Sequence, residues 1–115
     1  MKSSRRPLVA RKMPTTVELG GVHLKIREVA TLPKGKDKSE TIGHFDSATA
    51  SIRIIKTLDP EAKKFVLLHE LGHAVVWQHS GQLGDEQEEK LCDAFARIIL
   101  GLIRHNKDLI AWLDK

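Results

Sequence analysis

The stretch that decides the fold is DPEAKKFVLLHELGHAVVWQHSG, residues 59–81. Its Asp-Pro-Glu start is typical of a helix, because Asp can accept hydrogen bonds from free backbone N–H groups and Pro tolerates the first helical position. Up to the stop signal at Gly81, only Gly72 disfavours a helix. We therefore predict one helix over residues 61–80, with apolar runs on both sides of its centre.

The centre of this helix carries HELGH, residues 69–73. On a helix, residues four apart lie about 40° apart around the axis and about 6 Å apart along it, so His69 and His73 point the same way. Their imidazoles can both reach one ion at roughly 2.0–2.1 Å, which predicts Zn²⁺ as a cofactor. Glu70 lies about 100° round from His69, where it can act as a catalytic base without binding the ion.

The surroundings of these polar residues favour a metal over a chance pattern. FVLL precedes them and AVVW follows the second histidine, so the segment is expected to be buried. Burying three polar groups without partners would cost about 1–3 kcal/mol each. A bound metal ion removes that cost.

A catalytic zinc ion usually has three protein ligands and an open position, so a third ligand is needed. His79 follows His69 at the spacing of HExxHxxGxxH, but Val76 stands where that pattern needs a glycine to turn the chain back. On a continuous helix His79 lies about 15 Å from His69 along the axis, so it cannot bind the same ion. We expect a capping or surface role for it.

The other candidates lie in EEKLCDAFA, residues 88–96. Glu89 and Asp93 are four apart and share a helix face. If this helix packs antiparallel to the first, Glu89 comes opposite His73, and we predict it as the third zinc ligand. Asp93 is then placed to accept the N–H of a ligating histidine. Glu88 lies one position round, and we do not expect its loss to reduce zinc affinity sharply.

The sequence before the motif predicts strands. Residues 15–28, TTVELGGVHLKIRE, alternate apolar and polar side chains on both sides of the Gly-Gly pair 20–21, which suits a two-residue hairpin turn. Residues 31–40 are expected to form an exposed loop, because they hold Pro, Gly and several charges. Residues 41–46 and 51–56 are predicted to form a second hairpin, giving a sheet of about four short strands.

The sequence after the motif predicts two more helices. One runs from near Asp85 to about Arg104, and Asn106 can cap a short last helix over residues 107–113. Strands followed by helices indicate an α+β fold, here a small antiparallel or mixed sheet followed by the HExxH helix, the helix with Glu89 and a short last helix. Residues 1–14 are interpreted as a basic flexible tail, and residues 15–115 as a single domain.

Composition limits the classes of function. A chain of 115 residues fits one domain. No apolar run approaches the roughly 18–20 residues of a membrane span, and no apolar signal core follows the basic N-terminus. Cys92 is the single cysteine, which fits a reducing compartment, so we expect a cytoplasmic protein with no membrane partner. Much of the +4 net charge lies in the first twelve residues, without an aromatic platform, and we do not expect nucleic acid as a partner.

Together, LLHELGHAV and the E-x-x-C-D-A-F-A of residues 89–96 resemble the ImmA/IrrE-like zinc peptidases, which show HExxH and then E-x-x-A-[ND]-x-F-A. Cys92 stands where that family usually has alanine. The resemblance covers residues 41–104, and more loosely 15–115. It implies a minimal zincin-like fold and a gluzincin-type metallopeptidase, often associated with phages or mobile elements, that acts on a protein such as a transcriptional repressor. The residues it implies are His69, His73 and Glu89 for zinc, Glu70 as general base and Asp93 as support.

One departure from gluzincins concerns the oxyanion of the tetrahedral intermediate, which many of them stabilise with a Tyr or His. The chain has no Tyr, and His44, on a predicted strand, is our candidate for an oxyanion or substrate contact. The rival hypothesis is a regulatory module with a structural zinc ion, whose terminal LIAWL segment docks a protein partner. Trp112 is then a docking anchor instead of core packing. The oligomeric state is left open.

Overall fold

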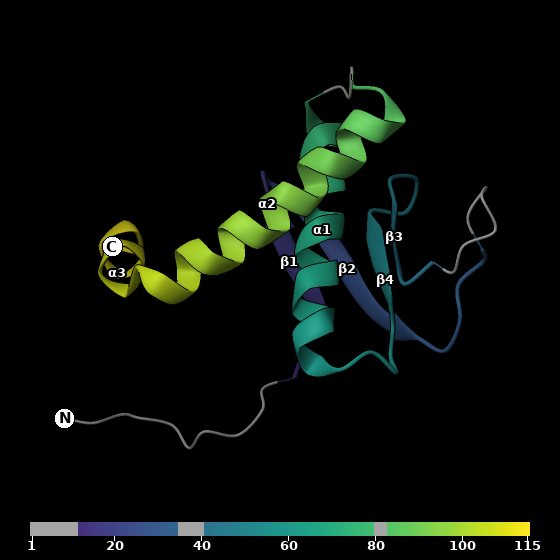
Figure 1. Ribbon diagram of the computed structural model, residues 1–115, viewed down its shortest axis with the longest axis horizontal. Coiled ribbons are helices and arrows are strands. Elements are labelled where there is room, and N and C mark those ends of the chain that lie inside the picture. The colour runs from purple at the N-terminus through teal and green to yellow at the C-terminus, as the bar shows by residue number, and fades with distance from the viewer. Residues whose placement is uncertain (1–11, 35–40, 80–82) are drawn as a thin grey trace.

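The computed structural model describes residues 12–34, 41–79 and 83–115 (Figure 1). The strands are β1 (Thr16–Leu19), β2 (Val22–Val29), β3 (Gly43–Asp46) and β4 (Ser51–Ile55). The helices are α1 (Pro60–Gln78), α2 (Asp85–His105) and α3 (Lys107–Leu113). The predicted α+β fold, with a small mixed sheet before the HExxH helix, is confirmed. Most of the predicted tail 1–14, most of the loop 31–40 and the stop signal Gly81 lie outside the described residues.

The sheet has the strand order β1-β2-β4-β3. Both predicted hairpins are present as antiparallel pairs, and the central pair β2–β4 is parallel. Val17 lies opposite Leu24, as the alternation predicts. Gly20 and Gly21 have φ angles of +59° and +85°, the backbone conformation that favours glycine in a tight hairpin turn. The strand β3 forms one edge of the sheet.

The core lies between α1 and one face of the sheet. Side chains alternate between the two faces of a strand, and those that face α1 are apolar and buried. The buried cluster consists of Leu24, Ile26, Ile52, Ile54, Val66, Leu71 and Ala74. His23 and Lys25, which alternate with the buried residues of β2, are exposed on the other face. This layer of apolar contacts fixes α1, and with it the HExxH motif, against β3 and β4.

The two ends of α1 are held by side-chain hydrogen bonds. The backbone N–H of Ala62 donates to Oδ1 of Asp59 at 2.7 Å, and Pro60 is the first helical residue, as predicted. The helix ends at Gln78, slightly before the predicted boundary. The Gln78 side-chain amide donates to the carbonyl of Leu19 at 2.7 Å, which ties the end of α1 to the first hairpin.

The helix α2 packs closely on α1 because Gly72 has no side chain. A Cβ atom at Gly72 would lie 3.1 Å from Sγ and 3.2 Å from Cα of Cys92, so a larger residue would push the helices apart. Cys92 is fully buried at this contact, and burial raises the pKa of its thiol to about 12. At the other end of α2, Arg104 forms two hydrogen bonds with Glu61. The first half of α2 is thereby held beside the histidines of α1.

The C-terminal helix α3 contacts the body of the protein through α2. Asn106 precedes α3, but its side chain does not cap it, which corrects the prediction. Its amide instead donates to the carbonyl of Leu102 at 3.1 Å, closing the end of α2. Trp112 is 72% exposed, so it is not part of the core. Within the described residues, no helix has the length and apolar character needed to cross a membrane.

Candidate metal centre

The two histidines of the motif lie on consecutive turns of α1 and face the same point. Nε2 of His69 and Nε2 of His73 are 3.2 Å apart, and their side chains are 14% and 17% exposed. Leu71 and Ala74, which flank them on the core side of the helix, are buried as expected. The spacing of the motif therefore produces the predicted pair of converging imidazoles.

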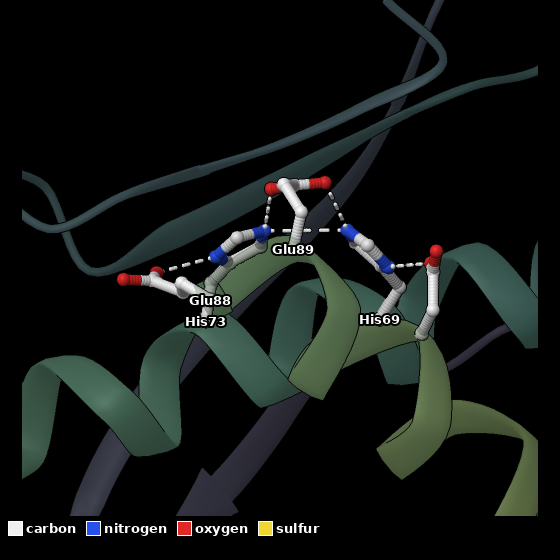
Figure 2. Close-up of polar contacts among 5 residues, drawn as sticks. His69, His73, Glu88 and Glu89 are labelled. Atoms are coloured by element: carbon white, nitrogen blue, oxygen red, sulfur yellow. Dashed lines mark hydrogen bonds and ion pairs between the residues drawn. The ribbon is translucent and has the colours of Figure 1, made fainter. Parts of the chain in front are cut away.

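The helix α2 supplies a carboxylate to the same point (Figure 2). Oε1 of Glu89 lies 3.2 Å from Nε2 of His69, and Oε2 lies 2.7 Å from Nε2 of His73. One ligand atom from each of these three residues lies within 4.8 Å of the other two. The structure thus brings together the three residues that the sequence singled out as zinc ligands.

The outer nitrogen of each imidazole contacts a second carboxylate. Nδ1 of His69 lies 2.7 Å from Oδ1 of Asp93, the residue expected to support a ligating histidine. Nδ1 of His73 lies 2.6 Å from Oε2 of Glu88 (Figure 2). Sequence reasoning missed this second contact. The signal was the spacing of Glu88 and Cys92, four residues apart, which turns Glu88 toward α1 with the buried cysteine.

The chemistry of this donor set fits a cation. Ionised carboxylates only accept hydrogen bonds, so Asp93 and Glu88 require a proton on Nδ1 of each ring. Both Nε2 atoms then present lone pairs toward each other and toward Glu89. Three converging acceptors need a positive charge between them. Two imidazoles and one carboxylate form a donor set that zinc binds. A tetrahedral ion with bonds of roughly 2.0–2.1 Å separates its ligand atoms by about 3.3–3.4 Å, close to the 3.2 Å between the two Nε2 atoms.

The electrostatics of His73 agree with a site that attracts positive charge. Burial lowers the pKa of His73, but the hydrogen bond with Glu88 and the negative charges of Glu70 and Glu89 outweigh it. The net result is a pKa above the usual value of histidine. The carboxylates around the ring therefore favour a proton or a metal ion over a neutral site.

Glu70 lies beside the cluster and outside the group of three ligands. Its side chain is 6% exposed and faces β3, where the backbone N–H of Phe45 donates to its carboxylate. Burial raises the pKa of Glu70, although the nearby charges of His73 and His69 lower it. Gly43 makes room for this carboxylate, since a Cβ atom there would lie 3.1 Å from Oε2 of Glu70 and 2.5 Å from Cγ1 of Val66.

A cavity of about 260 Å³ opens next to the cluster. Its walls combine apolar side chains with the ligands and carboxylates of the centre. They are Ile42, Gly43, Phe65, Val66, His69, Glu70, Glu89 and Asp93. The cavity therefore gives a small segment of another molecule access to Glu70 and to the point where the histidines converge.

Two other histidines lie away from this centre. His44 is exposed and pairs with Arg53 in the β3–β4 register. Because Gly43 and Phe45 face α1, His44 projects from the opposite face of the sheet, and it does not line the cavity. This placement gives no support to the expected oxyanion or substrate contact. His79 is at the end of α1 and outside the cluster, as expected.

Two histidines of an HExxH helix, a glutamate from the next helix and the buried Glu70 beside them match the residue types found in HExxH metallopeptidase sites. A family model, Peptidase_M78, described as the IrrE N-terminal-like domain, matches residues 26–100 of the 115-residue chain. The chain belongs to this peptidase family, as the sequence motifs implied. Neither the curated proteins nor the solved structures gave a match.

The contact of Glu88 with His73 gives Glu88 a role that the sequence did not predict. We expect Glu88→Ala to weaken zinc binding about 10–100-fold, because the loss of a partner on Nδ1 frees the ring and its tautomer. Competition with a chromophoric chelator measures this affinity. Glu86→Ala is the matched control, since Glu86 is an exposed acid in the same turn. Equal zinc affinity in the two variants would show that the contact has no role in binding.

Proposed function

We propose that this chain is a zinc-dependent metallopeptidase that hydrolyses peptide bonds in a protein or peptide substrate. The observation that carries the proposal is the convergence of His69, His73 and Glu89 on one point, with buried Glu70 and an open cavity beside it. Among the described residues the cluster has three ligand side chains. Three ligands leave a coordination position for solvent or substrate, as in catalytic zinc sites. Membership of a peptidase family supports the same reaction class.

Each residue of the centre has a separate task. His69, His73 and Glu89 hold the ion, while Asp93 and Glu88 orient the two rings through Nδ1. When bound, zinc acts as a Lewis acid that makes the attacking water more acidic and polarises the scissile carbonyl.

Glu70 is the general base of the proposed reaction. Burial raises its pKa, which makes the carboxylate a stronger base than an exposed glutamate. The N–H of Phe45 holds this carboxylate at the wall of the cavity. Glu70 takes a proton from the attacking water and returns it to the nitrogen of the leaving group.

The edge strand β3 is the proposed platform for the substrate. It pairs only with β4 among the described strands, so its outer backbone groups can receive an extended peptide. Gly43 keeps the strand close to Glu70, and Ile42 and Phe65 offer an apolar wall for a side chain next to the scissile bond. A regulatory protein such as a transcriptional repressor is the substrate class that we propose to test first.

Removal of the metal is expected to stop the reaction. The full chain, zinc-loaded or chelated, is incubated with a mixed protein library that includes repressors, and new peptide termini are identified by mass spectrometry. We expect termini that appear with zinc, vanish after chelation and return when zinc is added back. Cleavage that persists after chelation contradicts the proposal. A zinc-loaded chain that creates no new termini favours the rival, a regulatory module with structural zinc.

A further inference from the structure

Exposed apolar side chains gather on the last two helices. Of the ten large hydrophobic residues that are exposed in the described parts of the chain, seven belong to α2 and α3. These are Leu91, Ile98, Leu102, Ile103, Leu109, Trp112 and Leu113. In Figure 1, α2 crosses α1 on the side away from the sheet and then extends beyond it toward α3. Six of these seven residues therefore lie in the second half of α2 or in α3, beyond the first turns of α2 that carry Glu89.

Part of the surface is a regular stripe along α2. Leu91, Phe95, Ile98 and Leu102 follow one another at intervals of four, three and four residues, so they lie within about 60° around the helix axis. Phe95 is half-buried against the core, and Ile98 is 65% exposed. The buried residue Cys92 lies about 100° round from the start of the stripe, toward α1. The stripe thus runs along the border of the packed face of α2, which Phe95 joins, and its other three side chains, Leu91, Ile98 and Leu102, are exposed.

The spacing of the stripe is symmetric. Leu91 and Leu102 are equally far from the midpoint between residues 96 and 97, and so are Phe95 and Ile98. When a second copy of α2 is laid antiparallel on the first, Leu91 meets Leu102 and Phe95 meets Ile98 at both ends. Seams with intervals of three and four residues are those in which apolar side chains of two helices interlock. With a two-fold axis through the midpoint, a single partner helix contacts all four side chains of the stripe.

Two cations of α2 are matched by acids of the same chain. Lys90 lies 3.7 Å from Glu86 in the same helix, and Arg104 is paired with Glu61 of α1. Acids of the same chain therefore match these two cations. Within α2, which is described from end to end, the four stripe positions themselves carry no charge. An uncharged, self-complementary face is suited to another copy of itself.

The apolar area is sufficient for a dimer. Exposures of 38–72% for the seven side chains correspond to roughly 600 Å² per copy, since large side chains offer about 150–250 Å² each. A stable interface buries about 800 Å² per partner, of which about 56–65% is apolar. In an antiparallel pair the α3 of one copy, with Trp112, lies next to the start of α2 in the other. Both helices then contribute to one continuous interface.

We propose that this protein forms a two-fold homodimer in which the stripe of one α2 packs antiparallel against the stripe of its partner. The dimer buries Ile98 at the centre of the interface and Trp112 near its ends. The cavity beside Glu70 is on the side of α1 that faces β3, so dimerisation leaves the metal centre accessible.

The oligomeric state tests this directly. Sedimentation of the full chain between about 1 and 100 μM, where a specific dimer of moderate affinity forms, is expected to show twice the chain mass. Ile98→Glu is expected to give a monomer with unchanged zinc affinity, because Ile98 does not touch the centre. Arg97→Glu, which adds the same carboxylate about 100° round the helix, is expected to stay dimeric. A monomeric wild type, or a dimer that survives Ile98→Glu, overturns the proposal.

Disulfide trapping tests the register of the dimer. In a Cys92→Ala background, Leu91→Cys and Leu102→Cys together are expected to yield an oxidised dimer, because these positions meet across the antiparallel seam. Either cysteine alone is expected to give little cross-linking. Efficient cross-linking through Leu91→Cys alone means that the helices are parallel, which contradicts the proposed packing.

Discussion

Replacing Glu70 with glutamine is expected to lower kcat/KM for peptide hydrolysis about 10²–10⁴-fold, the contribution of a positioned general base. Glutamine has nearly the same shape, so its amide oxygen can still accept the Phe45 N–H that holds Glu70. It cannot accept a proton from water at neutral pH. The proposed zinc ligands are untouched, and we expect the metal content to be unchanged. Rates are measured on a peptide identified by the proteolysis profile, and zinc is measured by mass spectrometry.

The control for this experiment is Glu18→Gln, which makes the same chemical change at an exposed position of β1. This variant is expected to hydrolyse the peptide at the wild-type rate. Full activity in Glu70→Gln would show that another group is the base. Loss of zinc from Glu70→Gln would show that Glu70 binds the ion and that the division of tasks between Glu70 and Glu89 is wrong.

Removing Glu89 is expected to cause a larger loss of zinc affinity than removing its neighbour Glu88. Oε1 and Oε2 of this residue lie between the two imidazoles, and Glu89→Ala leaves only His69 and His73 as ligands. The loss should exceed the roughly 10–100-fold expected for Glu88→Ala, which removes a partner of a ligand. Metal competition on both variants measures the difference.

The two variants are closely matched, because Glu88 and Glu89 are adjacent on α2; Glu88 contacts the outer nitrogen of His73, whereas Glu89 contacts Nε2 of both histidines. Equal losses from the two alanine variants would contradict the assignment of Glu89 as the ligand. A larger loss from Glu88→Ala would exchange their roles.

The local parts of the fold were predictable from short-range chemistry. The Gly-Gly pair fixed the first hairpin through its positive φ angles, and Asp59 with Pro60 fixed the start of α1. The parallel pairing of β2 with β4 was not predicted, because contacts between distant strands leave no local pattern. The role of Asn106 was also predicted wrongly, because its side chain lies between two helices and can bond to either one. It donates to the carbonyl of Leu102 in α2 and does not cap α3.

The centre was predictable to the extent that helix periodicity determines it. His69 and His73 converge because four residues make about one turn, and Glu89 with Asp93 follows the same rule on α2. The contact of Glu88 depends on how closely α2 approaches α1, which Gly72 and Cys92 set together. The side of β3 to which His44 points depends on the sheet register. Neither quantity can be obtained from the periodicity of a single element.

The most direct test of the central claim is a crystal structure of the zinc-loaded full chain, with the ion located by anomalous scattering at the zinc edge. Our account predicts one zinc ion bound by Nε2 of residues 69 and 73 and by the carboxylate of residue 89, with solvent at the remaining position. An ion held by Cys92 or by a fourth protein side chain, or an ion away from these three residues, would contradict it.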